Sequence, residues 1–190
     1  MIRIAQAQDA EAIHAIYAPH VEGGAATFEN VLPGVAAMRE RMLARLPHYP
    51  WLVWEEAGDV LAYAYAGRFR ERAAYDWIAE TSIYVHPDAQ RRGIARRLYG
   101  ALLDTMRLQG LTQAVGVITL PGTTSVAFHE SLGFTPAGVW RQCGWKLGCW
   151  WDVGVWQLEL QRAALPPPAV TPFATLAATP ALSALLGRVP

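Results

Sequence analysis

The sequence predicts a mixed α/β fold, in which strands join into one sheet and helices pack against it. Strand-like runs with alternating apolar residues and helix-like runs with a three- to four-residue apolar spacing follow one another through residues 1–162. Apolar residues make up 53% of the 190-residue chain, which is too much for a disordered protein. That length allows one domain, or one domain with a tail.

The first 68 residues predict three strands and two helices. Asp9 is a favourable N-cap for a helix that carries Ile13 and Ile16. We expect this helix to end before Pro19, because proline has no N–H for the helical hydrogen bonds. The other elements are a short strand starting at Ile2, a helix over residues 35–46 closed by Pro47, and a hairpin of strands 51–56 and 60–68.

Residues 76–85 predict a third strand of the central region, and its alternation divides the side chains between two faces. Glu80 shares one face with Ser82 and Tyr84. The remaining elements follow in order: a helix over residues 91–109 ended by Gly110, a buried strand over 114–120, a short helix over 125–132, and two aromatic strands over 134–146 and 151–160.

Residues 163–190 form a separate Pro/Ala-rich tail after a domain of residues 1–162. Six of the 13 prolines lie in it, and the run 166–168 blocks both helix and internal strand. We expect a tail that dangles or lies on the surface. The alternative is a short helix, carrying Leu182, Leu185 and Leu186, that docks on the domain or on a partner subunit.

Composition excludes several classes of protein. Sixteen basic and 16 acidic residues give zero net charge, which argues against nucleic acid as a partner bound through bulk charge. Cys143 and Cys149 suit neither a disulfide scaffold nor a zinc site, so we expect no metal. With no secretory signal and no run of about 20 apolar residues, the sequence predicts a cytoplasmic protein without a membrane partner.

The run Gln90-Arg91-Arg92-Gly93-Ile94-Ala95-Arg96-Arg97 lies at a predicted strand–turn–helix junction. Unpaired N–H groups at a helix N-terminus and a glycine that permits close approach can hold a phosphate. Four arginines in seven residues add positive charge. A solvated basic helix face is the ordinary alternative. A dinucleotide site is a poorer one, since further glycines are missing, and a P-loop is excluded.

This run resembles the acetyl-CoA motif of the GNAT N-acetyltransferases. Residues 72–85, 117–121, 125–134 and 151–157 resemble the phosphinothricin and methionine sulfoximine acetyltransferases of that family, in the same order. The resemblance covers residues 1–160 and implies the GNAT fold, a seven-stranded, mostly antiparallel mixed sheet flanked by helices. Ala95 stands where Gly is commoner, and Gly122 stands where close relatives usually have an Asn that touches the cofactor.

The resemblance implies acetyl-CoA as co-substrate. Its pyrophosphate rests on the motif, and its pantetheine arm runs beside the preceding strand. The implied cofactor-binding residues are Ile83, Tyr84, Val85, Gln90, Arg91, Arg92, Gly93, Ile94, Ala95, Arg96, Ser125 and Phe128.

The resemblance also implies two catalytic residues. Glu80 stands at the position of the general base, acting through a water, and His129 stands where many members carry a Tyr as general acid. A near-neutral intrinsic pKa suits His129 for proton transfer. Without the resemblance, a solvent-facing strand Glu and a helix-surface His are the ordinary interpretations.

Substrate selection is expected from Arg70, Arg72 and Tyr75, since two arginines can grip a carboxylate or phosphinate. Phe28 and Glu29 resemble the family's substrate-lining segment. The tryptophans of residues 140–156 are expected in the core or in a homodimer interface.

The predicted activity is direct transfer of an acetyl group, in a ternary complex, to the α-amine of a small anionic amino-acid analogue. Phosphinothricin, methionine sulfoximine and methionine sulfone are the expected types. A peptide or protein N-terminus or a polyamine remains an alternative acceptor, and a non-catalytic acyl-CoA-binding module is an alternative class.

Overall fold

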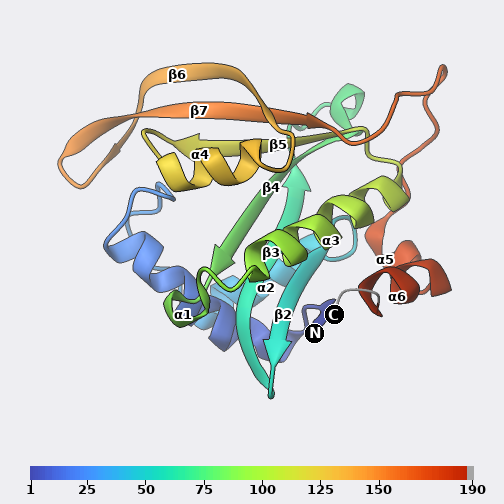
Figure 1. Ribbon diagram of the computed structural model, residues 1–190, viewed down its shortest axis with the longest axis horizontal. Coiled ribbons are helices and arrows are strands. Elements are labelled where there is room, and N and C mark those ends of the chain that lie inside the picture. The colour runs from blue at the N-terminus through green and yellow to red at the C-terminus, as the bar shows by residue number, and fades with distance from the viewer. Residues whose placement is uncertain (188–190) are drawn as a thin grey trace.

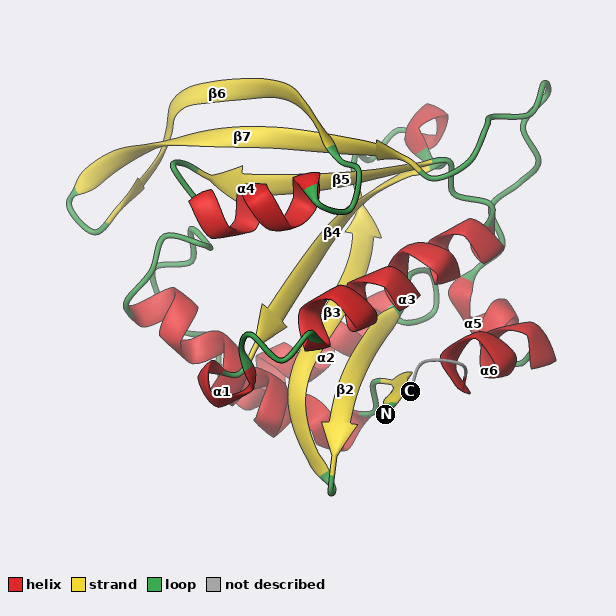
Figure 2. Ribbon diagram, in the orientation of Figure 1, coloured by secondary structure: helices red, strands yellow, loops and turns green. Residues whose placement is uncertain are grey.

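The computed structural model describes residues 1–187 and contains one seven-stranded sheet with helices on both faces (Figures 1 and 2). The strand order is β1-β2-β3-β4-β5-β7-β6, and every neighbouring pair is antiparallel except β4 and β5. The strands are β1 Ile2–Ile4, β2 Trp51–Glu56, β3 Asp59–Arg68, β4 Ile78–Val85, β5 Gln113–Thr119, β6 Thr135–Lys146 and β7 Cys149–Glu159. The predicted mixed, mostly antiparallel sheet is confirmed.

Six α-helices lie in the described residues: α1 Ala10–Glu22, α2 Val35–Arg45, α3 Ile94–Gln109, α4 Thr123–Glu130, α5 Phe173–Ala177 and α6 Pro180–Gly187. The two-residue alternation of β2 divides the core between the two faces of the sheet. Leu52 and Trp54 pack with α3, whereas Trp51 and Val53 pack with α1 and α2. No helix of residues 1–187 is long and apolar enough to cross a membrane.

Two predicted helix ends were wrong. Helix α1 continues through Pro19 to Glu22, because the hydrogen bond that proline forgoes falls in an exposed last turn where water can replace it. The Asp9 side chain makes no cap to α1 and instead accepts from the backbone N–H of Gln6 and from Arg3. Helix α3 begins at Ile94 rather than at residue 91, since Arg91 and Gly93 have positive φ angles.

The parallel strands β4 and β5 pair over only four residues. Their register runs from Ile78 opposite Gln113 to Thr81 opposite Gly116, and there it ends. Beyond this point β4 continues along β3 to Val85, while β5 continues along β7 to Thr119. The two strands therefore part within the sheet (Figure 1), and backbone groups of residues 82–85 that face the opening have no strand partner on that side.

The expectation of a dangling tail was wrong, and the alternative of a docked helix describes the structure. Phe173 and Leu182 are 1% exposed and pack with Ile4 and Leu46 of the domain. The backbone N–H of Phe173 donates to His48 O (3.3 Å) at the end of α2. The prolines 166–168 form no helix or strand, as expected. The predicted division of the chain at residue 162 stays a prediction.

Candidate active site

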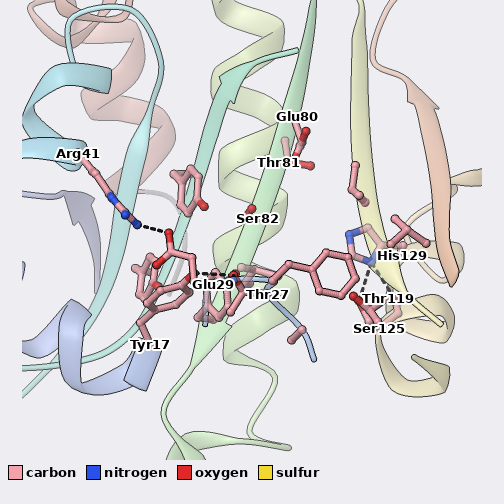
Figure 3. A pocket seen from close by; sticks show the side chains of 18 of the residues that line it. Tyr17, Thr27, Glu29, Arg41, Glu80, Thr81, Ser82, Thr119, Ser125 and His129 are labelled. Atoms are coloured by element: carbon pink, nitrogen blue, oxygen red, sulfur yellow. Dashed lines mark hydrogen bonds and ion pairs between the residues drawn. The ribbon is translucent and has the colours of Figure 1, made fainter. Parts of the chain in front are cut away.

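A cavity of about 690 Å³ lies where β4 and β5 part. Side chains reach it from the segment 26–29, from α1, α2 and α4, and from strands on both sides of the opening. Figure 3 shows Glu80, Thr81 and Ser82 along β4, with Ser125 and His129 across the cavity from them. The structure therefore brings both predicted catalytic residues to one cavity.

Glu80 lines this cavity from the middle of β4 and is half-buried. Burial raises the pKa of its carboxyl group, and the positive charges of Arg45 and Arg70 lower that pKa by smaller amounts. A raised carboxyl pKa strengthens the conjugate base, so Glu80 has the chemistry of a general base near neutral pH.

His129 is 5% exposed and both of its ring nitrogens have hydrogen-bond partners. Nδ1 lies 2.8 Å from the carbonyl oxygen of Ser125, which can only accept, so Nδ1 carries a proton. Nε2 lies 3.1 Å from the hydroxyl of Tyr99, and that hydroxyl lies 2.6 Å from Thr81 Oγ1. Burial lowers the pKa of the imidazole, and the Ser125 carbonyl raises it. The histidine is thus a buried, fixed ring.

Gly116 on β5 makes room for this ring. A β-carbon at Gly116 would lie 2.7 Å from His129 Cδ2 and 2.8 Å from Nε2, closer than atoms can approach. The imidazole therefore rests on the bare backbone of β5 at Gly116, the last residue of β5 that pairs with β4.

The predicted anion site has the geometry of an open helix N-terminus. Gly93 has φ of 79°, which an L side chain rarely adopts, and a β-carbon there would meet no atom within 4 Å. Three of the neighbouring arginines contact the protein. Arg92 pairs with Glu56 at 2.6 Å, Arg96 donates to Ser131 Oγ at 3.0 Å, and Arg97 lies over the Trp54 ring. Backbone N–H groups of the first helical turn are left to bind an anion.

Other predicted cofactor residues lie around the same region. Ile83 and Tyr84 line the cavity with Ser125, while Phe128 packs edge-on against Tyr99. Val85 ends β4, and Gln90, Ala95 and Arg96 surround the start of α3. The backbone at Gly122 leaves no room for a side chain, since a β-carbon there would lie 2.4 Å from Thr119 O. This local conformation excludes the Asn that the resemblance leads us to expect at this position.

The predicted substrate residues divide into two groups. Phe28 and Glu29 line the cavity. Arg70, Arg72 and Tyr75 lie in an exposed segment outside its lining, although the charge of Arg70 reaches Glu80. Their substrate role stays a prediction.

Two arginines of α2 line the cavity and were not predicted. Arg45 lies over the rings of Trp51 and Tyr65, at 5.9 and 5.1 Å from their centroids. Arg41 is hydrogen bonded to Glu29, whose second oxygen, Oε2, is buried without a partner. Their four-residue spacing is the signal that could have paired them on one helix face.

Lys146, the only lysine of the sequence, holds the segment that carries Phe28 and Glu29. It is 3% exposed, and its ammonium donates to His20 O (3.2 Å) in the last turn of α1 and to Thr27 O (2.9 Å), directly before Phe28. Burial lowers the pKa of this ammonium. Two residues earlier on β6, Gly144 leaves the space that the Phe28 ring fills.

A half-buried glutamate, a fixed histidine and an open helix N-terminus around a split parallel strand pair form the arrangement expected of an N-acyltransferase. Residues 2–155 match the family described as acetyltransferase (GNAT) domain, and the chain belongs to this family of N-acetyltransferases. The sequence resemblance to its phosphinothricin and methionine sulfoximine acetyltransferases is confirmed by curated relatives and a solved structure.

Three relatives illustrate the similarity. The phosphinothricin N-acetyltransferase of Streptomyces viridochromogenes is 39% identical over 88% of this chain and 91% of its own. The L-methionine sulfoximine/L-methionine sulfone acetyltransferase of Pseudomonas paraeruginosa is 35% identical over 87% and 98%. The crystal structure of a phosphinothricin acetyltransferase from Sinorhizobium meliloti in complex with acetyl-CoA has a TM-score of 0.85 at 35% identity, covering 91% of this chain and 96% of its own.

Proposed function

We propose that the protein transfers the acetyl group of acetyl-CoA directly to the α-amine of a small anionic amino acid of the phosphinothricin or methionine sulfoximine type. The observation that carries this proposal is Glu80, a half-buried carboxylate with a raised pKa, inside the cavity where β4 and β5 part. The names of the relatives support the substrate class.

The residues fit the co-substrate. The turn at Gly93 and the first N–H groups of α3 suit a pyrophosphate, because the backbone there faces open space at a positive φ angle. The backbone of residues 83–85, unpaired on the side of β5, would hold the amide-bearing arm. Acetyl-CoA supplies the activated thioester, and the protein binds it and manages the protons.

Two side chains carry the proton steps in this proposal. Glu80, through a water, takes the proton of the acceptor ammonium and frees its nitrogen for attack. His129 supplies the proton that the departing thiolate needs. The backbone N–H groups of β4 beside the opening can stabilise the oxyanion that develops on the acetyl carbonyl.

The charges of the cavity favour an amino acid over a polyamine. The charge of Arg45 acts on Glu80, and its guanidinium lies over the stacked rings of Trp51 and Tyr65, which hold it ready for a carboxylate. A polyamine requires a site with excess negative charge, and this cavity has two arginines against two glutamates. A peptide N-terminus, the second acceptor candidate, has no carboxylate next to its amine.

A thiol-release assay tests the proposal. Acetyl-CoA is combined with phosphinothricin, methionine sulfoximine, methionine sulfone, a dipeptide and spermidine. We expect turnover on the amino-acid analogues and little on the other two. Glu80→Gln should lose at least 100-fold in kcat/KM, in line with the roughly 10²- to 10⁴-fold contribution of general-base catalysis. Glu71→Gln, an exposed carboxylate outside the cavity, is the control. No turnover on any small amino acid would exclude the proposed function.

We also propose a homodimer through the β6–β7 hairpin. Trp140, Trp145 and Trp150 are 45%, 53% and 57% exposed there, with Val139 and Leu147 beside them. Exposed aromatic groups of this size mark an interaction surface. Light scattering on the purified protein should give the mass of two chains, and a monomer at micromolar concentration contradicts this assignment. The cytoplasmic location and the absence of nucleic-acid partners stay predictions.

A further inference from the structure

An unbroken chain of hydrogen bonds runs beneath the cavity between two backbone carbonyls. It starts at Ser125 O, which lies 2.8 Å from His129 Nδ1, and passes through the imidazole to the hydroxyl of Tyr99 at 3.1 Å from Nε2. From there it continues to Thr81 Oγ1 at 2.6 Å and ends at Val115 O, 3.0 Å further on. Both ends of the chain are groups that can only accept hydrogen bonds.

A count of the available protons shows which protonation state of His129 satisfies every contact in this chain of hydrogen bonds. Four contacts separate the two carbonyls, so four protons are needed for all of them to be hydrogen bonds. The hydroxyls of Tyr99 and Thr81 supply two. A neutral imidazole supplies one more and leaves one contact unmade, whereas an imidazolium supplies two and completes the set. The arrangement is complete only when His129 is protonated.

The apolar surroundings of the His129 ring disfavour its charged form, so the imidazolium depends on the hydroxyls of Tyr99 and Thr81. Tyr99, Phe128 and Phe134 pack against the imidazole, and burial by itself favours the neutral form. The nearby charged groups of α3 and α4 are engaged elsewhere. Glu130 accepts from the Trp156 indole on β7, and Arg96 of α3 bonds Ser131.

Other titratable groups line the same cavity. They are Glu80 on β4, Glu29 beside Thr27, Cys143 on β6, the arginines Arg41 and Arg45 of α2, and the phenols of Tyr17, Tyr63, Tyr65 and Tyr84. The hydroxyls of Tyr99 and Thr81 are therefore the protein groups that directly contact Nε2 or extend from that contact (Figure 3 shows Thr81 and His129).

We propose that Tyr99 and Thr81 are positioning residues that hold His129 as an imidazolium and orient it for proton transfer. This inference rests on the proposed function, in which His129 supplies a proton to the thiolate. When the thiolate leaves, its sulfur takes the Nε2 proton of the imidazolium, and a neutral imidazole with Nδ1–H remains. The Tyr99 hydroxyl then turns to donate to Nε2. One of the two protons that the acceptor ammonium loses restores the imidazolium.

The test is a titration of His129 by NMR with histidine labelled at its ring nitrogens, and His129→Asn identifies its signal among those of the five histidines. Tyr99→Phe and Thr81→Val should each move the midpoint of this titration about one pH unit lower, the size expected for a lost hydrogen bond to a charged group. Thr81→Ser keeps the hydroxyl and should restore the midpoint. Thr105→Val is the matched control, because Thr105 is a buried hydroxyl of α3 that bonds only Ala101 O.

Activity gives a second, separate readout. The alkaline limb of the kcat–pH profile should fall at lower pH in Tyr99→Phe and Thr81→Val, since the protonated acid is lost earlier. If Tyr99→Phe does not fold, the comparison of the His129 midpoints in Thr81→Val and Thr81→Ser still tests the inference. Unchanged His129 midpoints in the folded variants would overturn the inference. A lowered midpoint with an unmoved kcat profile would instead uphold the network and remove His129 from the acid role in the proposed function.

Discussion

Thr81 on β4 and Gly116 on β5 are the last residues through which the two parallel strands are paired. Each of these two residues also helps to hold His129, which lies across the opening. The Thr81 hydroxyl links the chain of hydrogen bonds from His129 to Val115 O, and the Gly116 backbone supports the imidazole ring. The point at which the sheet divides is thus the point at which the proposed acid is held.

Gly116→Ala tests this support. The added methyl group would lie 2.7 Å from His129 Cδ2, so the ring must leave the position in which its Nε2 contacts Tyr99. We expect kcat to fall at least 10-fold, as misplacement by about an ångström can cost 10²-fold, with the KM for acetyl-CoA little changed. The control is Gly100→Ala on α3, where a β-carbon meets no atom within 4 Å. A fully active, folded Gly116→Ala enzyme would show that the ring position does not matter.

Gly93→Ala tests the anion site at the start of α3. A side chain at φ of 79° is strained, at a cost of roughly 1 kcal/mol, and crowds the proposed pyrophosphate position. We expect a several-fold higher KM for acetyl-CoA with little change in kcat. Gly110→Ala imposes the same kind of strain, at φ of 92°, on the other end of the helix. Steady-state kinetics and urea unfolding should show similar stability losses but a KM change only for Gly93→Ala.

Arg45→Met tests the electrostatics of the base. The reaction needs Glu80 deprotonated, so the acid limb of kcat/KM follows the pKa of Glu80, which burial has raised above its ordinary value. Arg45 lowers that pKa, and its removal should move the acid limb to higher pH. It should also raise the KM for an acceptor with a carboxylate. Arg39→Met, an exposed arginine on the same helix, should leave both unchanged. If the acid limb of Arg45→Met stays at the wild-type pH, then Glu80 is not the group whose deprotonation produces that limb.

Lys146→Met tests whether the segment of Phe28 and Glu29 selects the acceptor. The variant leaves the carbonyls of His20 and Thr27 without their donor and loosens this segment. The KM for the acceptor should rise severalfold while the KM for acetyl-CoA stays constant. The control is Arg141→Met on the same strand, whose side chain is 80% exposed. Equal changes in both KM values would point to general loosening of the fold.

Local sequence patterns predicted the elements of the domain well. The alternation of β4 predicts that Glu80 shares a face with Ser82 and Tyr84, because a strand repeats every two residues, and all three line the cavity. The glycine within the arginine cluster likewise indicated an open helix start. Propensity was misleading at Pro19, where an exposed last turn tolerates the missing donor.

The remaining features depend on contacts between distant segments. The sequence shows Gly116 as an ordinary strand glycine, and only the fold brings the ring of His129, thirteen residues later on α4, against it. Lys146 lies more than 100 residues from the carbonyls that it binds. The tail carries its leucines at helical spacing, but their place to pack is set by the half-buried Ile4 and Leu46 of the domain. A local sequence pattern does not show which distant segments will pack against each other.

The central claim is that Glu80 is the base of an acetyl transfer to a small amino acid. The most direct measurement is the pH dependence of kcat/KM for phosphinothricin or methionine sulfoximine in the wild type and in Glu80→Gln. The wild type should show an acid limb above the ordinary pKa of a glutamate, and the variant should lose that limb together with at least 100-fold of its rate. Equal rates with the same acid limb in both proteins would contradict the claim.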